Sequence, residues 1–186
     1  MTTTAGTSST CCAAKEERKG AVTFKGKPMT SVGPQLKPGD TAPNFEVVGT
    51  DLAPVTLADS KGKVRLISVV TSLDTGICDA QTRKFNEEAA KLPGNVEILT
   101  VSMDLPFAGK RWCGAAGIDK VKVLSDHRTR SFGTAYGTLM KELRLLSRAI
   151  FVVDGKDTVR YAEYVPEVGT HPNYDAALAA VRQIAK

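Results

Sequence analysis

The order of hydrophobic and polar positions along the chain predicts alternating strands and helices. Two β-branched, apolar runs, Val64–Val70 and Val96–Ser102, are typical of strands that are buried on both faces. Between these two runs, apolar residues recur at helical spacing and predict a helix from about Thr75 to about Leu92. A strand, a helix and a further strand therefore follow one another, which is the pattern of an α/β domain.

The same pattern predicts further elements on both sides of this unit. Short strands are expected at 44–48, 55–57 and 121–124, further helices at 106–116, 130–136 and 174–184, and hairpins at 21–32 and 149–164. These elements predict a thioredoxin-like α/β fold, with a central mixed sheet, helices on both of its faces and an N-terminal β-hairpin.

The start of the chain differs from the rest in composition. Residues 1–20 are rich in Thr, Ser and Ala and hold few large apolar side chains. Such a segment buries too little apolar surface to offset the entropy lost on ordering. We therefore expect a disordered N-terminal tail over residues 1–20 and a single thioredoxin-like domain over residues 21–186.

Charge and hydropathy exclude two classes of partner. The net charge of +5 comes from 25 basic and 20 acidic residues that are interspersed along the chain, so we expect no nucleic-acid partner. No apolar run approaches the roughly 20 residues of a membrane-spanning helix, and the first residues lack the pattern of a secretory signal. We expect no membrane association and a cytoplasmic location.

The cysteines point to redox chemistry. Four cysteines, at positions 11, 12, 78 and 113, are too few to staple a secreted scaffold of this length, and no CxxC motif is present. The two histidines, His127 and His171, are remote in sequence from every cysteine, so we expect neither a metal site nor a bound cofactor. The vicinal pair Cys11 and Cys12 lies in the expected tail, and we take it to be incidental to function.

Cys78 occupies a position that favours reactivity. It is expected in the first turn of a helix that follows a buried strand, which is where reactants collect in α/β sheets. The free N–H groups and the helix dipole stabilise a thiolate there. The alternative is that Cys78 is a small buried apolar residue, and its position alone leaves both interpretations open.

Three segments carry a resemblance to a known family: VVTSLDTGICDAQTRKFNEEA, DLPFAGKRWCGAAG and RAIFVVD. Their content and order resemble the peroxiredoxins, specifically the thiol peroxidase subfamily of atypical two-cysteine type, from about Val22 to the C-terminus. The resemblance implies that Cys78 is the peroxidatic cysteine, Cys113 the resolving cysteine, Thr75 the active-site hydroxyl and Arg148 the active-site arginine.

The resemblance also implies an activity and partners. It implies a peroxidase that reduces hydrogen peroxide and organic hydroperoxides through a sulfenic acid on Cys78, which Cys113 converts to an intramolecular disulfide. Thioredoxin would be the reductant and the protein would be a homodimer. The alternative is a non-enzymatic peroxide sensor that uses the same cysteine pair as a redox switch.

Physical reasons support these roles. Attack of a thiolate on an O–O bond spreads negative charge over sulfur and oxygen, and Arg148 and Thr75 would supply donors to that charge. A sulfenic acid condenses with a second thiol, but a disulfide requires Cα atoms about 4.4 to 6.8 Å apart. Because Cys113 is expected on a different helix from Cys78, we expect one or both helical turns to unwind during the cycle.

Several residues leave questions open. Thr71 stands where the family has a proline, which is either a tolerated variation or a change that weakens the site. Arg83 either braces the site or pairs with Glu87, and Asp74 is a helix cap in preference to a base. Four apolar residues are candidates for a collar around an organic peroxide, although core packing is the other interpretation for each: Phe45, Leu73, Phe85 and Phe107.

Overall fold

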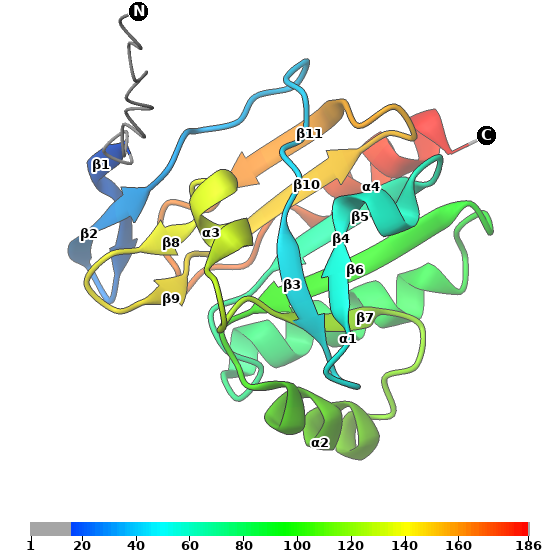
Figure 1. Ribbon diagram of the computed structural model, residues 1–186, viewed down its shortest axis with the longest axis horizontal. Coiled ribbons are helices and arrows are strands. Elements are labelled where there is room, and N and C mark those ends of the chain that lie inside the picture. Colours follow the sequence, from blue (N-terminus) through cyan, green and yellow to red (C-terminus); the bar gives the residue numbers. More distant parts are fainter. Residues whose placement is uncertain (1–15, 186) are drawn as a thin grey trace, which may run out of the picture.

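The computed structural model describes residues 16–185 and contains a central sheet of seven strands in the order β11-β10-β5-β6-β7-β3-β4 (Figure 1). The strands are β3 (Glu46–Gly49), β4 (Pro54–Thr56), β5 (Val64–Val69), β6 (Val96–Ser102), β7 (Lys122–Ser125), β10 (Ala149–Val153) and β11 (Val159–Tyr164). Strands β5, β6 and β7 are parallel, whereas β10 is antiparallel to β5. The predicted mixed sheet is confirmed.

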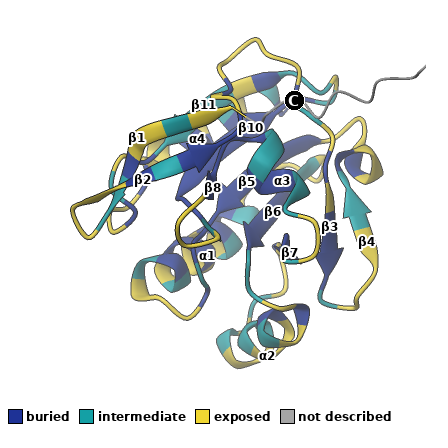
Figure 2. Cartoon of the chain, turned by 60° about the vertical axis from the view of Figure 1, so that its left-hand side comes forward, coloured by how far each residue is buried: buried dark blue, intermediate teal, exposed yellow. Residues whose placement is uncertain are grey.

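Strand β5 lies at the centre of this sheet. All six of its residues are buried, and it pairs with β6 on one side and β10 on the other. Figure 2 shows β5 and β10 in the colour of buried residues, and β6 in this colour over most of its length. A strand covered on both faces is mostly apolar, and its two polar side chains have partners: Arg65 donates to the Asp154 carbonyl and Ser68 accepts from Gln81.

Helices cover both faces of the central sheet, as predicted. They are α1 (Gly76–Ala89), α2 (Pro106–Ala116), α3 (Ser131–Ala135) and α4 (Tyr174–Ile184), with a 3-10 turn at Leu57–Ser60. In Figure 1, α1 and α4 lie behind the sheet and α3 lies in front of it. This arrangement confirms the thioredoxin-like fold and places the first turn of α1 at the carboxyl end of β5.

A second, four-stranded sheet is formed by the N-terminal hairpin and a short later hairpin, in the order β1-β2-β8-β9. Its strands are β1 (Glu17–Phe24), β2 (Lys27–Val32), β8 (Leu139–Met140) and β9 (Leu145–Leu146). The predicted N-terminal hairpin is confirmed. The pair β8 and β9 was not predicted, because two-residue strands carry no periodicity.

Strand β1 begins earlier than its composition indicates. Residues 17–20, which we assigned to the tail, belong to the hairpin, where Glu17 lies opposite Val32 and Arg18 opposite Ser31. Arg18 Nη2 also donates to the carbonyl of Gly137 at 2.6 Å. Backbone pairing and this tie compensate for the scarcity of apolar residues. The rest of the expected tail, including Cys11 and Cys12, lies outside the described residues.

Two helix boundaries and the membrane prediction can also be compared with the structure. Helix α1 ends at Ala89, earlier than the expected Leu92, and α2 covers Pro106–Ala116 as predicted. Within residues 16–185, no helix is both long enough and apolar enough to cross a membrane.

Candidate active site

The loop that follows β5 and the first turn of α1 position Cys78. Its side chain is completely buried and packs into an apolar cluster that includes Leu73, Phe85 and Leu178. The thiol is free in the structure. Both interpretations of Cys78 therefore have a structural basis, since the residue is buried and also lies at the reactive end of the sheet; its polar neighbours distinguish between them.

Arg148 is the polar group that contacts the sulfur. It directly precedes β10, whose Ala149 lies opposite Val69 at the end of β5, so the register places the arginine beside the start of α1. Arg148 Nη2 lies 3.3 Å from Cys78 Sγ. Arg148 is only 2% exposed, so this positive charge acts on the sulfur with little screening by water.

Two groups hold the guanidinium in this orientation. The carbonyl oxygen of Val168 accepts from Arg148 Nε at 3.1 Å and from Nη2 at 2.9 Å. Gln81 Oε1 accepts from Nη1 at 2.6 Å, and Gln81 Nε2 donates to Ser68 Oγ at 2.7 Å. Sequence reasoning missed Gln81 and Val168. Gln81 lies one helical turn after Cys78 on α1, a spacing that could have marked it as a neighbour.

Thr75 is the N-cap residue of α1, although its side chain does not cap the helix. Its Oγ1 donates to the carbonyl of Ser72 at 2.9 Å and makes no bond to the first-turn N–H groups. Asp74, the alternative cap, precedes the N-cap position. Because neither side chain covers them, the first-turn N–H groups stay open to an anionic oxygen.

A pocket of about 420 Å³ opens beside Arg148 and Thr75. Its polar wall includes Thr71, Thr75 and Arg148, and its apolar wall is made of Phe24, Ile77, Leu145 and Val168. Cys78 lies behind the polar wall. The N-terminal hairpin thus supplies part of the pocket through Phe24, a contribution that the sequence does not signal.

The four collar candidates do not line the pocket, and core packing, the other interpretation, is confirmed for three of them. Phe45, Leu73 and Phe85 belong to the buried core, and Phe107 is 68% exposed on α2. None of these four lines the pocket beside Arg148, whose apolar wall comes from the N-terminal hairpin, the first turn of α1, β9 and the loop after β11.

Thr71, which replaces the family proline, forms part of the pocket wall. The residue is 4% exposed, and its Oγ1 has no hydrogen-bond partner among residues 16–185. A buried hydroxyl without a partner destabilises a folded protein by roughly 1–3 kcal/mol. Thr71 therefore costs stability at a position next to the candidate reactive centre.

Asp104 ties the loop before α1 to the segment before α2. Its Oδ2 accepts from the backbone N–H of Leu73 at 2.7 Å and its Oδ1 from Ser72 Oγ at 2.8 Å. Ser102 Oγ donates to the same carboxylate at 2.9 Å. The conformation of the loop that presents Cys78 therefore depends on a residue two positions before α2.

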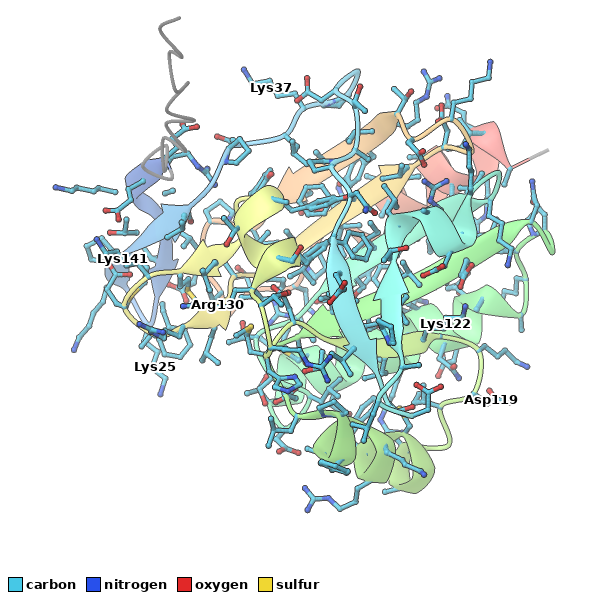
Figure 3. The ribbon with its side chains drawn as sticks, viewed as in Figure 1. Lys25, Lys37, Asp119, Lys122, Arg130 and Lys141 are labelled. Atoms are coloured by element: carbon cyan, nitrogen blue, oxygen red, sulfur yellow. The ribbon has the colours of Figure 1, made fainter. Side chains whose placement is uncertain are left out.

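Glu167 fixes the opposite side of the pocket. It accepts hydrogen bonds from Thr23 Oγ1 at 2.7 Å, from Lys25 N at 3.1 Å and from Gly26 N at 3.1 Å. The bond from Thr23, followed by the backbone bonds from Gly169 and Gly26, lowers the pKa of Glu167 to about 2. Figure 3 shows Lys25 at the tip of the hairpin that this carboxylate anchors. Glu167 thereby holds Val168, the acceptor of Arg148, in place.

Cys113 has different surroundings. It lies in the last turn of α2, is half-buried, and packs against the apolar cluster that contains Cys78. Its thiol is free, and burial raises its pKa. The structure thus brings Thr75 and Arg148 to one pocket with Cys78 behind its wall, and leaves Cys113 as a separate thiol on a neighbouring helix.

Metal ligation finds no support in this part of the chain. Among the described residues, no three His, Cys, Asp or Glu side chains are grouped so that they could hold a metal ion.

The fold and this site together define the class of thioredoxin-like proteins whose reactive group is a cysteine thiol. The Redoxin family model matches residues 37–178. A thiol peroxidase of Halalkalibacterium halodurans is 64% identical over 162 residues, covering 87% of this chain and 97% of the relative. A thiol peroxidase of Bacillus subtilis is 58% identical over 165 residues, covering 89% and 98% of the two chains.

Solved structures agree with these relatives. A peroxiredoxin-like protein from Aquifex aeolicus is 42% identical, covers 88% of this chain and 96% of its own, and superposes with a TM-score of 0.82. A thiol peroxidase from Chromobacterium violaceum is 22% identical with a TM-score of 0.79 and supports the fold alone. The chain belongs to the Redoxin family and, within it, to the thiol peroxidases.

Proposed function

We propose that this chain reduces hydrogen peroxide and organic hydroperoxides, with Cys78 as the attacking thiolate and Cys113 as the resolving thiol. The observation that carries the proposal is the 3.3 Å contact between Arg148 Nη2 and Cys78 Sγ. A permanent positive charge fixed on the sulfur stabilises the thiolate and then the oxygen anion that leaves the peroxide.

In the first step, the Cys78 thiolate attacks one peroxide oxygen while the O–O bond breaks. The sulfur is oxidised to a sulfenic acid, and the leaving oxygen takes a proton to become water or an alcohol. Arg148 and the open N–H groups of the first turn of α1 donate to this oxygen, and the Thr75 hydroxyl joins them once it turns away from the Ser72 carbonyl. Since Cys78 is fully buried, the pocket wall must shift for the peroxide to reach it.

In the second step, the Cys113 thiol attacks the sulfenic sulfur, a disulfide forms and water leaves. A dithiol then reduces the disulfide and becomes oxidised itself, which returns both cysteines to thiols. We propose thioredoxin as this dithiol. This choice rests on the family resemblance and has no structural counterpart among the contacts described above.

The pocket supports organic as well as inorganic peroxides. Its apolar wall of Phe24, Ile77, Leu145 and Val168 lies beside the Arg148 and Thr75 donors. An alkyl or aryl group could rest on this wall while the peroxide group points toward the donors. The volume of about 420 Å³ admits small organic hydroperoxides such as cumene hydroperoxide.

A homodimer and a cytoplasmic location complete the proposal. The homodimer rests on the family resemblance, and the cytoplasmic location rests on the sequence pattern. The oligomeric state can be measured by light scattering coupled to gel filtration of the reduced protein, where a single monomer mass at micromolar concentration would contradict the dimer. Cell fractionation of a producing strain tests the location.

The sensor hypothesis is not favoured, because thiol peroxidases match nearly the whole chain at high identity. Turnover separates the two functions. We expect the protein, with thioredoxin, thioredoxin reductase and NADPH, to oxidise many equivalents of NADPH upon addition of hydrogen peroxide or cumene hydroperoxide. Cys78→Ser should abolish this turnover. Consumption of only one equivalent by the wild-type protein, with the thioredoxin system active toward a control substrate, would contradict the proposal.

A further inference from the structure

Helix α2 is held to the rest of the molecule by few contacts. Only Pro106 and Gly109 of its residues are buried, while Trp112 and Cys113 are half-buried (Figure 2). Gly109 packs on β7, where an added Cβ would meet Val123 at 3.2 Å. These contacts secure the first half of α2. In the half that carries Cys113, Trp112 and Cys113 pack against the apolar cluster around Cys78, and polar contacts from α1 add to this packing.

One set of these polar contacts comes from an arginine of α1. Arg83 Nη1 donates to the carbonyl of Ala116, the last residue of α2, at 3.0 Å. Its guanidinium also lies over the ring of Trp112, with 5.8 Å between the guanidinium carbon and the ring centroid. One carbonyl and one aromatic face, on either side of Cys113 in sequence, are thus held by one side chain.

A second tie lies one turn further along α1. Asn86 Oδ1 accepts from the backbone N–H of Lys120 at 2.8 Å and of Asp119 at 3.3 Å. Figure 3 shows Asp119 on the segment that leaves α2. Arg83 and Asn86 therefore fasten the end of α2 and the loop after it to the same face of α1.

The other side of Arg83 faces the reactive turn. Arg83 Nε donates to Asp79 Oδ2 at 2.8 Å, and Asp79 directly follows Cys78. The backbone N–H of Asp79 donates to the Thr75 carbonyl at 2.9 Å, which is a hydrogen bond of the first turn of α1. If this turn unwinds, Asp79 moves with it and Arg83 loses the acceptor that orients its guanidinium.

We propose that Arg83 couples the opening of the two helical turns that carry Cys78 and Cys113. While the first turn of α1 is intact, Asp79 holds Arg83 against Ala116 and Trp112, and Cys113 stays half-buried. When that turn unwinds after Cys78 has been oxidised, the arginine is released and the end of α2 opens. Arg83 is a positioning residue in this scheme. The scheme rests on the proposed roles of Cys78 and Cys113.

The size of the effect is modest, because Arg83 is half-exposed. Its side chain is 45% exposed, and partly exposed ion pairs and charged hydrogen bonds change an equilibrium by about fivefold. Lys84, the next residue on α1, has the same 45% exposure and pairs with Glu88. It is a matched control, because it does not touch α2 in the described structure.

The first test measures the accessibility of Cys113 in the reduced protein and needs no peroxide. Alkylation by iodoacetamide, quantified for each cysteine by mass spectrometry, should be about fivefold faster at Cys113 in Arg83→Gln than in the wild type. Lys84→Gln should leave the rate unchanged. Amide hydrogen exchange over residues 113–120 should accelerate in Arg83→Gln in parallel. Equal Cys113 alkylation rates in Arg83→Gln and the wild type would overturn the proposal.

The second test addresses the coupling. Asp79→Asn should raise Cys113 alkylation as much as Arg83→Gln does, and the double variant should show no further increase, because both substitutions break one link. Additive effects of the two substitutions would mean that Asp79 and Arg83 act separately and would contradict the coupling.

The third test uses the reaction itself. In single-turnover experiments, Arg83→Gln should raise the first-order rate of disulfide formation about fivefold and leave the second-order rate of peroxide attack within twofold. An equal change in both rates would show a general structural effect and overturn the proposal. If the wild type formed no Cys78–Cys113 disulfide, the proposed resolving role would fail, while the alkylation and exchange results would still decide whether Arg83 holds α2.

Discussion

The two cysteines occupy environments that differ in rigidity. Cys78 is fully buried and lies 3.3 Å from a guanidinium that Val168 and Gln81 fix from two sides. Cys113 is half-buried in a helix that only a few groups hold in place. The difference matches the two steps of the proposed reaction. Peroxide attack requires donors that are already oriented, whereas disulfide formation requires a thiol that can move.

The largest expected effect on the rate of peroxide attack comes from a substitution of Arg148, which contacts the rigidly held Cys78. Arg148→Lys keeps the positive charge but cannot contact Cys78, Gln81 and the Val168 carbonyl together. We expect the second-order rate constant for peroxide attack to fall by about 100-fold, as for loss of a donor to a developing oxyanion. Stopped-flow measurement provides this rate constant. Arg160→Lys, on the exposed side of β11, is the control and should change it by less than twofold. An Arg148→Lys variant as fast as the wild type would show that charge alone suffices.

The next effect tests whether the guanidinium must be held. Gln81→Leu removes the acceptor of Arg148 Nη1 and leaves a buried charged donor without a partner. We expect about a tenfold loss in the rate of attack, since a hydrogen bond to a charged group contributes roughly 1.5–3 kcal/mol. Glu87→Gln, at an exposed position on the same helix, serves as the control in the same stopped-flow assay. A Gln81→Leu rate within twofold of the wild type would show that peroxide attack does not need Gln81 to orient Arg148.

The pH dependence of Cys113 alkylation tests the environment of the less rigidly held cysteine. Burial raises the pKa of the Cys113 thiol above that of a free cysteine, about 8.5. The closed form of α2 is therefore fully favoured below pH 8.5 and is progressively weakened as the pH rises through the raised pKa. Alkylation of Cys113 should keep increasing above pH 8.5, where the rate of a model peptide levels off. Site-resolved mass spectrometry measures both rates. If the two alkylation rates had the same pH dependence, burial would not raise the pKa of the Cys113 thiol.

The smallest expected effect is that of substituting Thr71, which stands where the family has a proline. Thr71→Val removes a buried hydroxyl that has no partner among the described residues, and Thr100→Val makes the same change inside β6. Both should raise the free energy of unfolding by about 1 kcal/mol, measured by urea denaturation. We expect Thr71→Val to leave the rate of attack within twofold. A tenfold loss confined to Thr71→Val would show that this hydroxyl contacts the peroxide during the reaction.

The sequence predicted the parts of the fold that repeat a period. The buried strands β5 and β6, helix α2 and the N-terminal hairpin follow from residue patterns, because the pattern records which face of each element is covered. Strands β8 and β9 have two residues each and exist because β8 pairs with β2 and β9 pairs with β8, which no local pattern can express. The extension of β1 to Glu17 has the same origin.

The residues of the candidate site also fall into two groups, those that local sequence reasoning could place and those that depend on contacts across the fold. Cys78 could be placed by local reasoning, since a strand followed by a helix fixes its position. Arg148, Thr75 and Cys113 entered through the resemblance, and the structure then gave Arg148 its contact with the sulfur. Gln81 and Val168 were missed, because their role depends on contacts with Arg148 across the fold. Of the two interpretations left open for Arg83, the Glu87 pair is not the one observed, since Arg83 binds Asp79 one turn earlier on α1 and the Ala116 carbonyl on α2.

A single-turnover time course would show directly whether peroxide oxidises Cys78 first and whether Cys113 then forms the disulfide. Reduced protein would be mixed with substoichiometric hydrogen peroxide and followed by the fluorescence of Trp112, the only tryptophan of the chain and the neighbour of Cys113. Quenched samples would be mapped by mass spectrometry. We expect a fast phase whose rate is proportional to the peroxide concentration and in which Cys78 is oxidised. A second phase, whose rate does not depend on the peroxide concentration, should form the Cys78–Cys113 disulfide. Oxidation at the rate of an ordinary thiol, or a disulfide that lacks either cysteine, would contradict this expectation.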